Sequence, residues 1–166
     1  MPKLEYGEKV DLDEKDKKIL KELQKDARQN IVDIEKKTGL GRDVIAYRIK
    51  KMEERDVIRQ HHTVINPQKI GYPLYSYVMF VCYNFSPEEE KRFVNYLKRQ
   101  KNIVYVAKNS GKFDFTIGVC AKNYKEFDEI IREIRQEFPE MIKDFETLPT
   151  VQEYKFDRMA ELVEGK

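Results

Sequence analysis

The 166-residue sequence has no tryptophan and only two cysteines, Cys82 and Cys120. A disulfide framework or a structural zinc site needs more thiols at closer spacing. Both cysteines lie within apolar runs typical of strands, where a free cysteine is a small packing residue in a reducing compartment. The sequence therefore predicts no disulfide and no metal site, and we expect a cytoplasmic protein.

Long apolar runs are absent as well. None reaches the roughly 18 residues that a membrane-spanning helix requires. The first six residues carry charges where a signal peptide needs an apolar stretch. No catalytic triad, suitably placed pair of carboxylates or phosphate-binding loop is visible. We therefore expect neither membrane insertion nor export, and neither enzyme activity nor a cofactor.

The histidines His61 and His62 are neighbours in the sequence. On a strand their side chains point to opposite faces, and no cysteine or acidic cluster nearby completes a metal site. We expect no catalytic or metal-binding role for either.

The net charge is only +2, but basic residues are concentrated in one segment. Residues 36–51 contain a single acid, Asp43, and six bases: Lys36, Lys37, Arg42, Arg48, Lys50 and Lys51. A local basic patch on a nearly neutral chain favours nucleic-acid binding. The alternative is a solvated lysine-rich face, which is common in a chain with 37% charged residues.

Three helices are predicted in the first 58 residues. The first follows Asp13, a typical N-cap residue, and the second begins at Asn30. The second ends at Gly39, because glycine can adopt the left-handed conformation of a sharp turn. The third runs from about residue 42 to residue 55. Three short helices with a glycine turn between the last two form a helix-turn-helix motif.

The spacing of apolar residues supports this motif. Counting from Ile31, the positions that hold two helices at a steep angle are the fourth, ninth, tenth and fifteenth, namely Ile34, Gly39, Leu40 and Ile45. The fifth position is usually small but is Glu35, whose stem we expect along the helix contact with its carboxylate in solvent. The side chains predicted to face the core are Ile19, Leu20, Leu23, Ile31, Ile34, Ile45, Ile49 and Met52.

After residue 73 the apolar pattern predicts strand, helix, strand, strand, helix and strand. The strands are expected at 74–83, 103–107, 113–121 and 142–148, and the helices after the N-cap residues Ser86 and Asn123. This order predicts a ferredoxin-like fold, a four-stranded antiparallel sheet with both helices on one face. We therefore expect an α+β protein with domains at 1–58 and 73–166, joined by a linker strand at 59–72.

The first strand of that sheet is apolar or aromatic on both faces. Tyr75, Tyr77, Met79, Val81 and Tyr83 alternate with Val78, Phe80 and Cys82. A sheet with an uncovered apolar face normally binds a partner, and a second copy is the simplest one. A two-fold dimer also presents two recognition helices, as a palindromic operator requires. The alternative, a base-stacking platform for single-stranded RNA, would need interleaved arginine or lysine residues.

Several of these segments resemble the Lrp/AsnC regulators. They span residues 12–156 and are Asp13-x-x-Asp16-x-x-Ile19-Leu20, Thr38-Gly39-Leu40, residues 48–58, Ile65-Asn66-Pro67-x-x-x-Gly71-Tyr72 and Gly111-x-Phe113-Asp114. The resemblance implies a winged-helix-like DNA-binding domain and a RAM (regulation of amino acid metabolism) effector domain. It also implies dimers that often form tetramers or octamers, and amino-acid binding between effector domains. We expect an archaeal member of this family.

The chain departs from the family in two places. Gly41 and Arg42-Asp43-Val44 replace the Ser and Pro-Ser-Thr that are common at the start of the third helix, which implies a different operator. Lys112 replaces a residue that is often acidic or polar in the effector turn, and at this position it favours an acidic or uncharged effector over a basic one.

The exposed side of the third helix is the predicted DNA-binding site. Arg42, Asp43, Ala46, Tyr47 and Lys50 are expected to face the major groove, and Arg48 and Lys51 the phosphates. The alternative is that some of them only form surface ion pairs. The predicted effector site is Asn109, Ser110, Gly111, Lys112, Phe113 and Asp114, whose amides and carboxylate suit an amino acid. A tight hairpin, however, needs the same glycine and aspartate.

The sequence thus predicts a sequence-specific DNA-binding transcription regulator that dimerises and responds to a small molecule. One alternative is a sirohaem decarboxylase, from a sister group that resembles Lrp-like proteins. That enzyme needs a histidine–tyrosine pair near the second strand, where this chain has Ile103-Val104-Tyr105-Val106. The other alternative is an oligomeric ligand sensor that does not bind DNA, and the complete helix-turn-helix argues against it.

Overall fold

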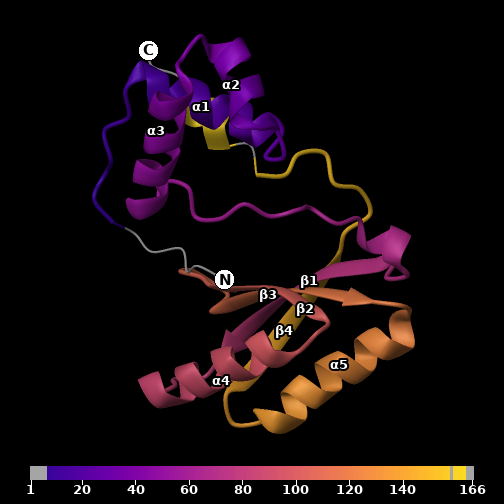
Figure 1. The fold of residues 1–166 in the computed structure, drawn as a ribbon. Helices are drawn as coiled ribbons and strands as arrows, with labels where there is room; N and C mark the ends of the chain where they lie inside the picture. The colour runs from indigo at the N-terminus through magenta and orange to yellow at the C-terminus, as the bar shows by residue number, and fades with distance from the viewer. Residues whose placement is uncertain (1–6, 158, 164–166) are drawn as a thin grey trace. The chain divides into compact units, whose positions relative to one another are not determined.

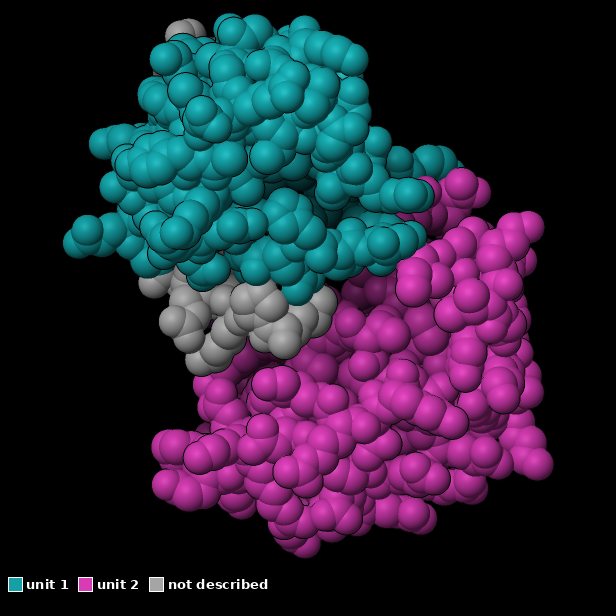
Figure 2. All heavy atoms as spheres, in the orientation of Figure 1, with its two compact units in different colours: residues 1–64, 154–166 teal, residues 65–153 magenta. Residues whose placement is uncertain are grey.

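The computed structural model describes residues 7–157 and 159–163. The chain divides into two compact units (Figure 2). Residues 1–64 and 154–166 contribute to the N-terminal unit, and residues 65–153 form the C-terminal unit. Within the described part of the chain, none of the helices combines the length and apolar character required to span a bilayer.

The N-terminal unit contains three α-helices, α1 (Glu14–Lys25), α2 (Ile31–Thr38) and α3 (Arg42–Glu54) (Figure 1). Asp13 caps α1 by accepting a hydrogen bond from the amide of Asp16, whose carboxylate accepts one from the Asp13 amide. Asn30 caps α2 through the amide of Asp33. Gly39 ends α2 with a φ of 70°. The predicted caps and the glycine turn are therefore confirmed.

The core of this unit consists of four buried side chains: Ile19, Ile34, Ile45 and Met52. Partly buried leucines and isoleucines pack against them: Leu12, Leu20, Leu23, Leu40, Ile49 and Ile58. Ile31 was also expected in this core, but it is 37% exposed. It is the first residue of α2, a helix of only 8 residues.

The predicted linker strand at 59–72 is not formed in this chain. Residues 59–66 have no regular secondary structure, and no described segment pairs with them. A lone extended segment cannot form a strand, because its N–H and C=O groups need a neighbouring strand. A short 3₁₀-helix, η1 (Pro67–Ile70), follows and is capped by Asn66.

The C-terminal unit has the predicted order of elements: β1 (Leu74–Cys82), α4 (Pro87–Arg99), β2 (Ile103–Lys108), β3 (Phe115–Ala121), α5 (Tyr124–Glu137) and β4 (Ile142–Pro149). The strands form one antiparallel sheet in the order β2-β3-β1-β4, and α4 and α5 pack on the same face (Figure 1). The ferredoxin-like prediction is confirmed. β3 begins at Phe115 rather than residue 113, because Asp114 belongs to the turn.

The two faces of the sheet differ. The face under the helices carries the core, whose largest members are Phe80, Phe93, Phe115, Leu97, Ile117 and Ile134. On the other face Tyr77 lies between Gly118 of β3 and Leu148 of β4. Residues in alternation with these share that face: Tyr75, Met79, Val81, Tyr105, Thr116, Cys120 and Glu146. We call it the open face, because neither helix of the unit covers it.

The C-terminal segment belongs to the N-terminal unit, which corrects the predicted domain at 73–166. A 3₁₀-helix, η2 (Met159–Val163), packs against α1. The Gln24 side chain donates to the carbonyl of Asp157 (2.7 Å) and accepts from the amide of Ala160 (2.6 Å). Contacts between residues so distant in sequence leave no periodic pattern, so the sequence did not reveal them.

Candidate DNA-binding helix and effector turn

Helix α3 separates its side chains into two faces. Ile45 and Met52 are buried against α1 and α2. The side chains that point away from this core are exposed, as predicted: Arg42, Asp43, Ala46, Tyr47 and Lys50. The helix begins after Gly41, which provides no side-chain cap, so its first amides are open to an external acceptor.

Tyr47 is the large aromatic residue on this exposed face. Its side chain is 64% exposed. The ammonium of Lys51, one turn later, lies 5.8 Å from the centre of its ring. Such a cation–π contact gives the ring a preferred position but leaves its edge and hydroxyl accessible. The face thus offers an aromatic group, a methyl group at Ala46 and charged groups within four turns of helix.

Arg42, at the start of α3, is bound to Glu35 of α2. Its Nε donates to the Glu35 carboxylate at 2.8 Å, across the glycine turn. Glu35 is the residue that departs from the usual helix-turn-helix pattern. Its carboxylate does reach the surface as expected, but the sequence did not identify its partner.

Arg48, which was predicted to contact phosphates, forms ion pairs within the N-terminal unit. Its guanidinium is within 2.8 Å of Asp13 and 2.7 Å of Asp16, so it joins α3 to the first turn of α1. Its side chain is only 20% exposed. These two carboxylates bind the Arg48 guanidinium inside the unit. The bond from the Asp16 amide and the Arg48 guanidinium hold the pKa of Asp13 below its ordinary value.

We expect Arg48→Ala to lower the melting temperature of the N-terminal unit by several degrees at neutral pH, because α3 loses its link to the α1 cap. A carboxyl with a depressed pKa stabilises the fold above its ordinary pKa of about 4, and that stability is lost as the pH falls through the lower, folded value. The variant should therefore show a weaker loss of stability in acid. Thermal unfolding followed at neutral and acidic pH measures both effects.

Lys50→Ala is the control, because Lys50 is exposed and only distantly paired with Glu54 (3.8 Å). An Arg48→Ala curve that matched the wild type at both pH values would show that the ion pairs do not hold the helices together.

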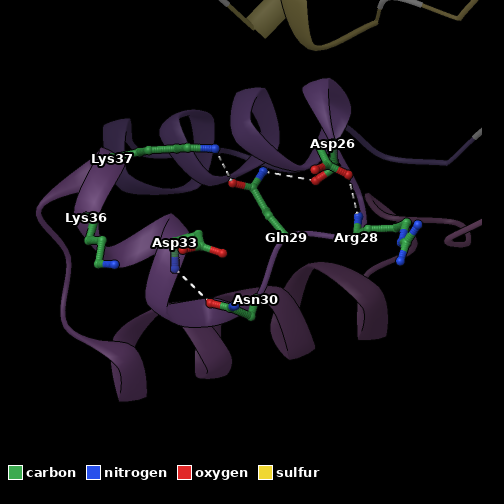
Figure 3. Close-up of a pocket in the computed structure, with 7 residues that line it drawn as sticks. All are labelled: Asp26, Arg28, Gln29, Asn30, Asp33, Lys36 and Lys37. Atoms are coloured by element: carbon green, nitrogen blue, oxygen red, sulfur yellow. Dashed lines mark hydrogen bonds between the residues drawn. The ribbon is translucent and has the colours of Figure 1, made fainter.

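A groove that the sequence did not predict is formed by α2 and the loop that joins α1 to it (Figure 3). It has a volume of about 580 Å³ and is lined by Asp26, Arg28, Gln29, Asn30, Asp33, Lys36 and Lys37. The side-chain amides at its centre stabilise the fold. Gln29 donates to the carbonyls of Glu22 in α1 and of Asp26, the residue that ends α1, and it accepts from Lys37. Asn30 caps α2. The remaining groups carry charges of both signs, so the groove is not a dedicated anion site.

The predicted effector residues form the turn between β2 and β3. Gly111 has a φ of 135°, and the amide of Asn109 donates to the Asp114 carbonyl at 2.8 Å. The Asp114 carboxylate accepts a hydrogen bond from the Cys82 amide of β1 at 2.7 Å. This bond fixes the turn to the neighbouring strand. Lys112 pairs with Glu146 of β4 and lies over the ring of Phe113.

The cysteines and histidines take part in ordinary packing and surface contacts. Burial raises the pKa of the Cys82 thiol to about 12, with a smaller effect from Asp114, and burial also raises the pKa of Cys120. His61 lies 3.1 Å from the Glu53 carboxylate. Within residues 7–157 and 159–163, no cluster of histidine, cysteine and acidic side chains could hold a metal ion.

Comparison with known proteins gives consistent matches. Residues 12–59 match a family model described as winged helix-turn-helix DNA-binding. The HTH-type transcriptional regulator FL11 of Pyrococcus abyssi is 32% identical over 123 residues, which are 74% of this chain and 80% of that protein.

Solved structures match over most of the chain. An AsnC family transcriptional regulator from Agrobacterium tumefaciens is 27% identical with a TM-score of 0.77, covering 87% of this chain and 94% of that one. The regulator NMB0573 from Neisseria meningitidis, solved in complex with L-Met, has the same fold at 17% identity, with a TM-score of 0.78 and coverage of 88% and 94%.

Proposed function

The chain belongs to the Lrp/AsnC family of DNA-binding transcription regulators, and we propose that it acts in the cytoplasm as a dimer that places two α3 helices in neighbouring major grooves. The observation that carries this proposal is the exposed face of α3. A helix of this length fits the major groove, and half-sites one helical turn apart match a two-fold dimer.

Most exposed residues of α3 have a specific chemical role in this proposal, and the exposed ring of Tyr47 adds an aromatic contact. Arg42 and Lys50 can donate to guanine, Asp43 can accept from cytosine, and the methyl group of Ala46 can contact thymine. Lys51 supplies a phosphate contact, which adds affinity and salt dependence but little specificity. Arg48 fixes α3 to the first turn of α1 instead of contacting DNA, because its guanidinium is paired with Asp13 and Asp16.

The open face of the sheet supports the dimer. Tyr77 makes edge-to-face contacts with Tyr75 and Tyr105, with ring centres 5.3 Å and 6.1 Å apart. A Cβ added to Gly118 would lie 3.0 Å from the Cβ of Tyr105 and 3.1 Å from the hydroxyl of Tyr75, so the tyrosines pack closely around this glycine. A packed aromatic surface of this kind suits a second copy better than solvent. Tetramers or octamers would use further surfaces.

Selection of bound duplexes from a random DNA pool tests the proposed function. The expected result is an enriched inverted repeat whose half-sites lie about one helical turn, or a multiple of it, apart. Enrichment of no sequence, with all duplexes bound equally, would contradict sequence-specific regulation and favour a ligand sensor that does not depend on DNA. Two observations argue against a decarboxylase. The similar protein FL11 is a transcriptional regulator, and the second strand lacks the histidine–tyrosine pair that the enzyme needs.

We further propose that the turn formed by residues 109–114 binds an amino acid or a similar small molecule. NMB0573, which shares the fold, was solved with L-Met. Free amides around Gly111 can hold a carboxylate, and the Lys112–Glu146 pair can exchange partners with a zwitterion. The side chain of Lys112 favours an acidic or uncharged ligand over a basic one.

Calorimetry with each amino acid in turn should show heat with an acidic or uncharged one. Lys112→Ala should weaken that binding about tenfold, because a hydrogen bond to a charged group is lost. Lys125→Ala, on α5 and exposed, is the control and should bind as the wild type does. The absence of heat with every amino acid would remove the amino-acid hypothesis.

A further inference from the structure

The ion pair between Glu35 and Arg42 leaves the two Nη groups of the arginine available to bind DNA. The Glu35 carboxylate accepts from Nε at 2.8 Å. Arginine has five N–H donors, and the two Nη groups carry four of them. No other hydrogen bond to Arg42 is found among the described residues, and its side chain is 62% exposed. The terminal donors therefore project from the start of α3 with no hydrogen-bond partner in the described part of the chain.

Guanine recognition uses two donors of this kind. An arginine in the major groove donates to O6 and N7 of guanine, the commonest specific contact between proteins and DNA. A free arginine loses much rotational freedom when it forms such a contact, and a side chain that is already held loses less. Because Glu35 holds Nε, it reduces that loss without occupying the Nη groups.

Neither the stability of the fold nor general affinity for DNA accounts for a glutamate at position 35. The position is usually small because α2 and α3 touch there, and an exposed ion pair adds little stability. A carboxylate on a DNA-binding surface also repels phosphates, which lowers affinity for all sequences alike. A residue that weakens general binding and orients one reading arginine increases the difference between specific and non-specific sites.

We propose that Glu35 is a positioning residue that fixes Arg42 for the recognition of guanine in the operator. This inference rests on the proposed function, since it assigns a specificity role within the same DNA-binding surface. Glu35 itself need not touch DNA. Its effect passes through Arg42, so the two residues should be coupled in their effect on base preference.

The test is a set of binding titrations on duplexes that differ only at one base pair. That base pair is the one at which Arg42→Ala loses its preference for guanine. Glu35→Ala should reduce the preference for guanine there by about fivefold to tenfold, part of what a full bidentate contact provides. Glu35→Gln keeps an acceptor and should retain most of the preference. In the Arg42→Ala background, Glu35→Ala should change the preference no further.

Glu53→Ala is the matched control, because it removes an exposed carboxylate of α3 that pairs with His61 and not with a proposed base-reading residue. It should raise affinity for every duplex by the same factor. The inference is overturned if Glu35→Ala behaves like this control, or if Arg42→Ala changes no base preference. If the wild-type protein selects no sequence at all, the proposed function fails instead, so the two failures are distinguishable.

Discussion

Replacing Tyr77 with arginine should abolish dimerisation. Tyr77 lies at the middle of the open face, between β3 and β4, and in a two-fold interface both copies carry the substitution. An unpaired charge buried at such a contact is unfavourable by about 3–5 kcal/mol. The association constant should therefore fall by more than ~100-fold. Sedimentation should show a species near 19.9 kDa where the wild type shows at least twice that mass.

Tyr124→Arg is the matched control for this change. Tyr124 is 73% exposed at the start of α5, on the opposite side of the sheet from the open face. The control should keep the wild-type mass, and both variants should keep the wild-type circular dichroism spectrum. A folded Tyr77→Arg variant that still sediments as a dimer would show that the open face is not the interface.

Tyr47→Ala and Arg42→Ala should weaken binding to the selected operator much more than binding to random DNA. Each removes a group from the exposed face of α3, and a good base contact is worth about 1–3 kcal/mol of discrimination. We therefore expect operator affinity to fall roughly tenfold to 100-fold per variant. Binding to random duplexes depends mainly on phosphate contacts, so it should fall by less than about threefold for Tyr47→Ala.

Fluorescence anisotropy titrations at one fixed salt concentration measure both affinities. Salt must be fixed because counterion release alone changes affinity over orders of magnitude. Tyr124→Ala, far from α3 in sequence and in the other unit, should bind both DNAs as the wild type does. Equal losses on operator and random DNA would refute the assignment of Tyr47 and Arg42 as base-reading residues.

The sequence predicted those features of the fold that depend on neighbours in the chain. The Asp13 cap and the turn at Gly39 require only a few adjacent residues, and both are present as expected. The alternation along residues 74–82 likewise reports which side chains face the helices. Such local signals also placed Arg42 and Tyr47 on the exposed face of α3.

The features that the sequence did not reveal depend on contacts between distant segments. Arg48 was assigned to phosphates because it is basic and lies on α3, but its partners are more than 30 residues away in the chain. The segment around Ala160 was assigned to the wrong unit for the same reason. The linker strand was predicted from the residue pattern within one segment, although a strand also needs a partner.

Sequence-specific binding by this protein depends on two α3 helices that a dimer presents to one duplex. A hydroxyl-radical footprint on the selected operator tests this directly. The expected pattern is two protected regions related by a two-fold axis and centred about 10 base pairs, or a multiple of that, apart. A single protected region with no symmetric counterpart, at saturating wild-type protein, would contradict it.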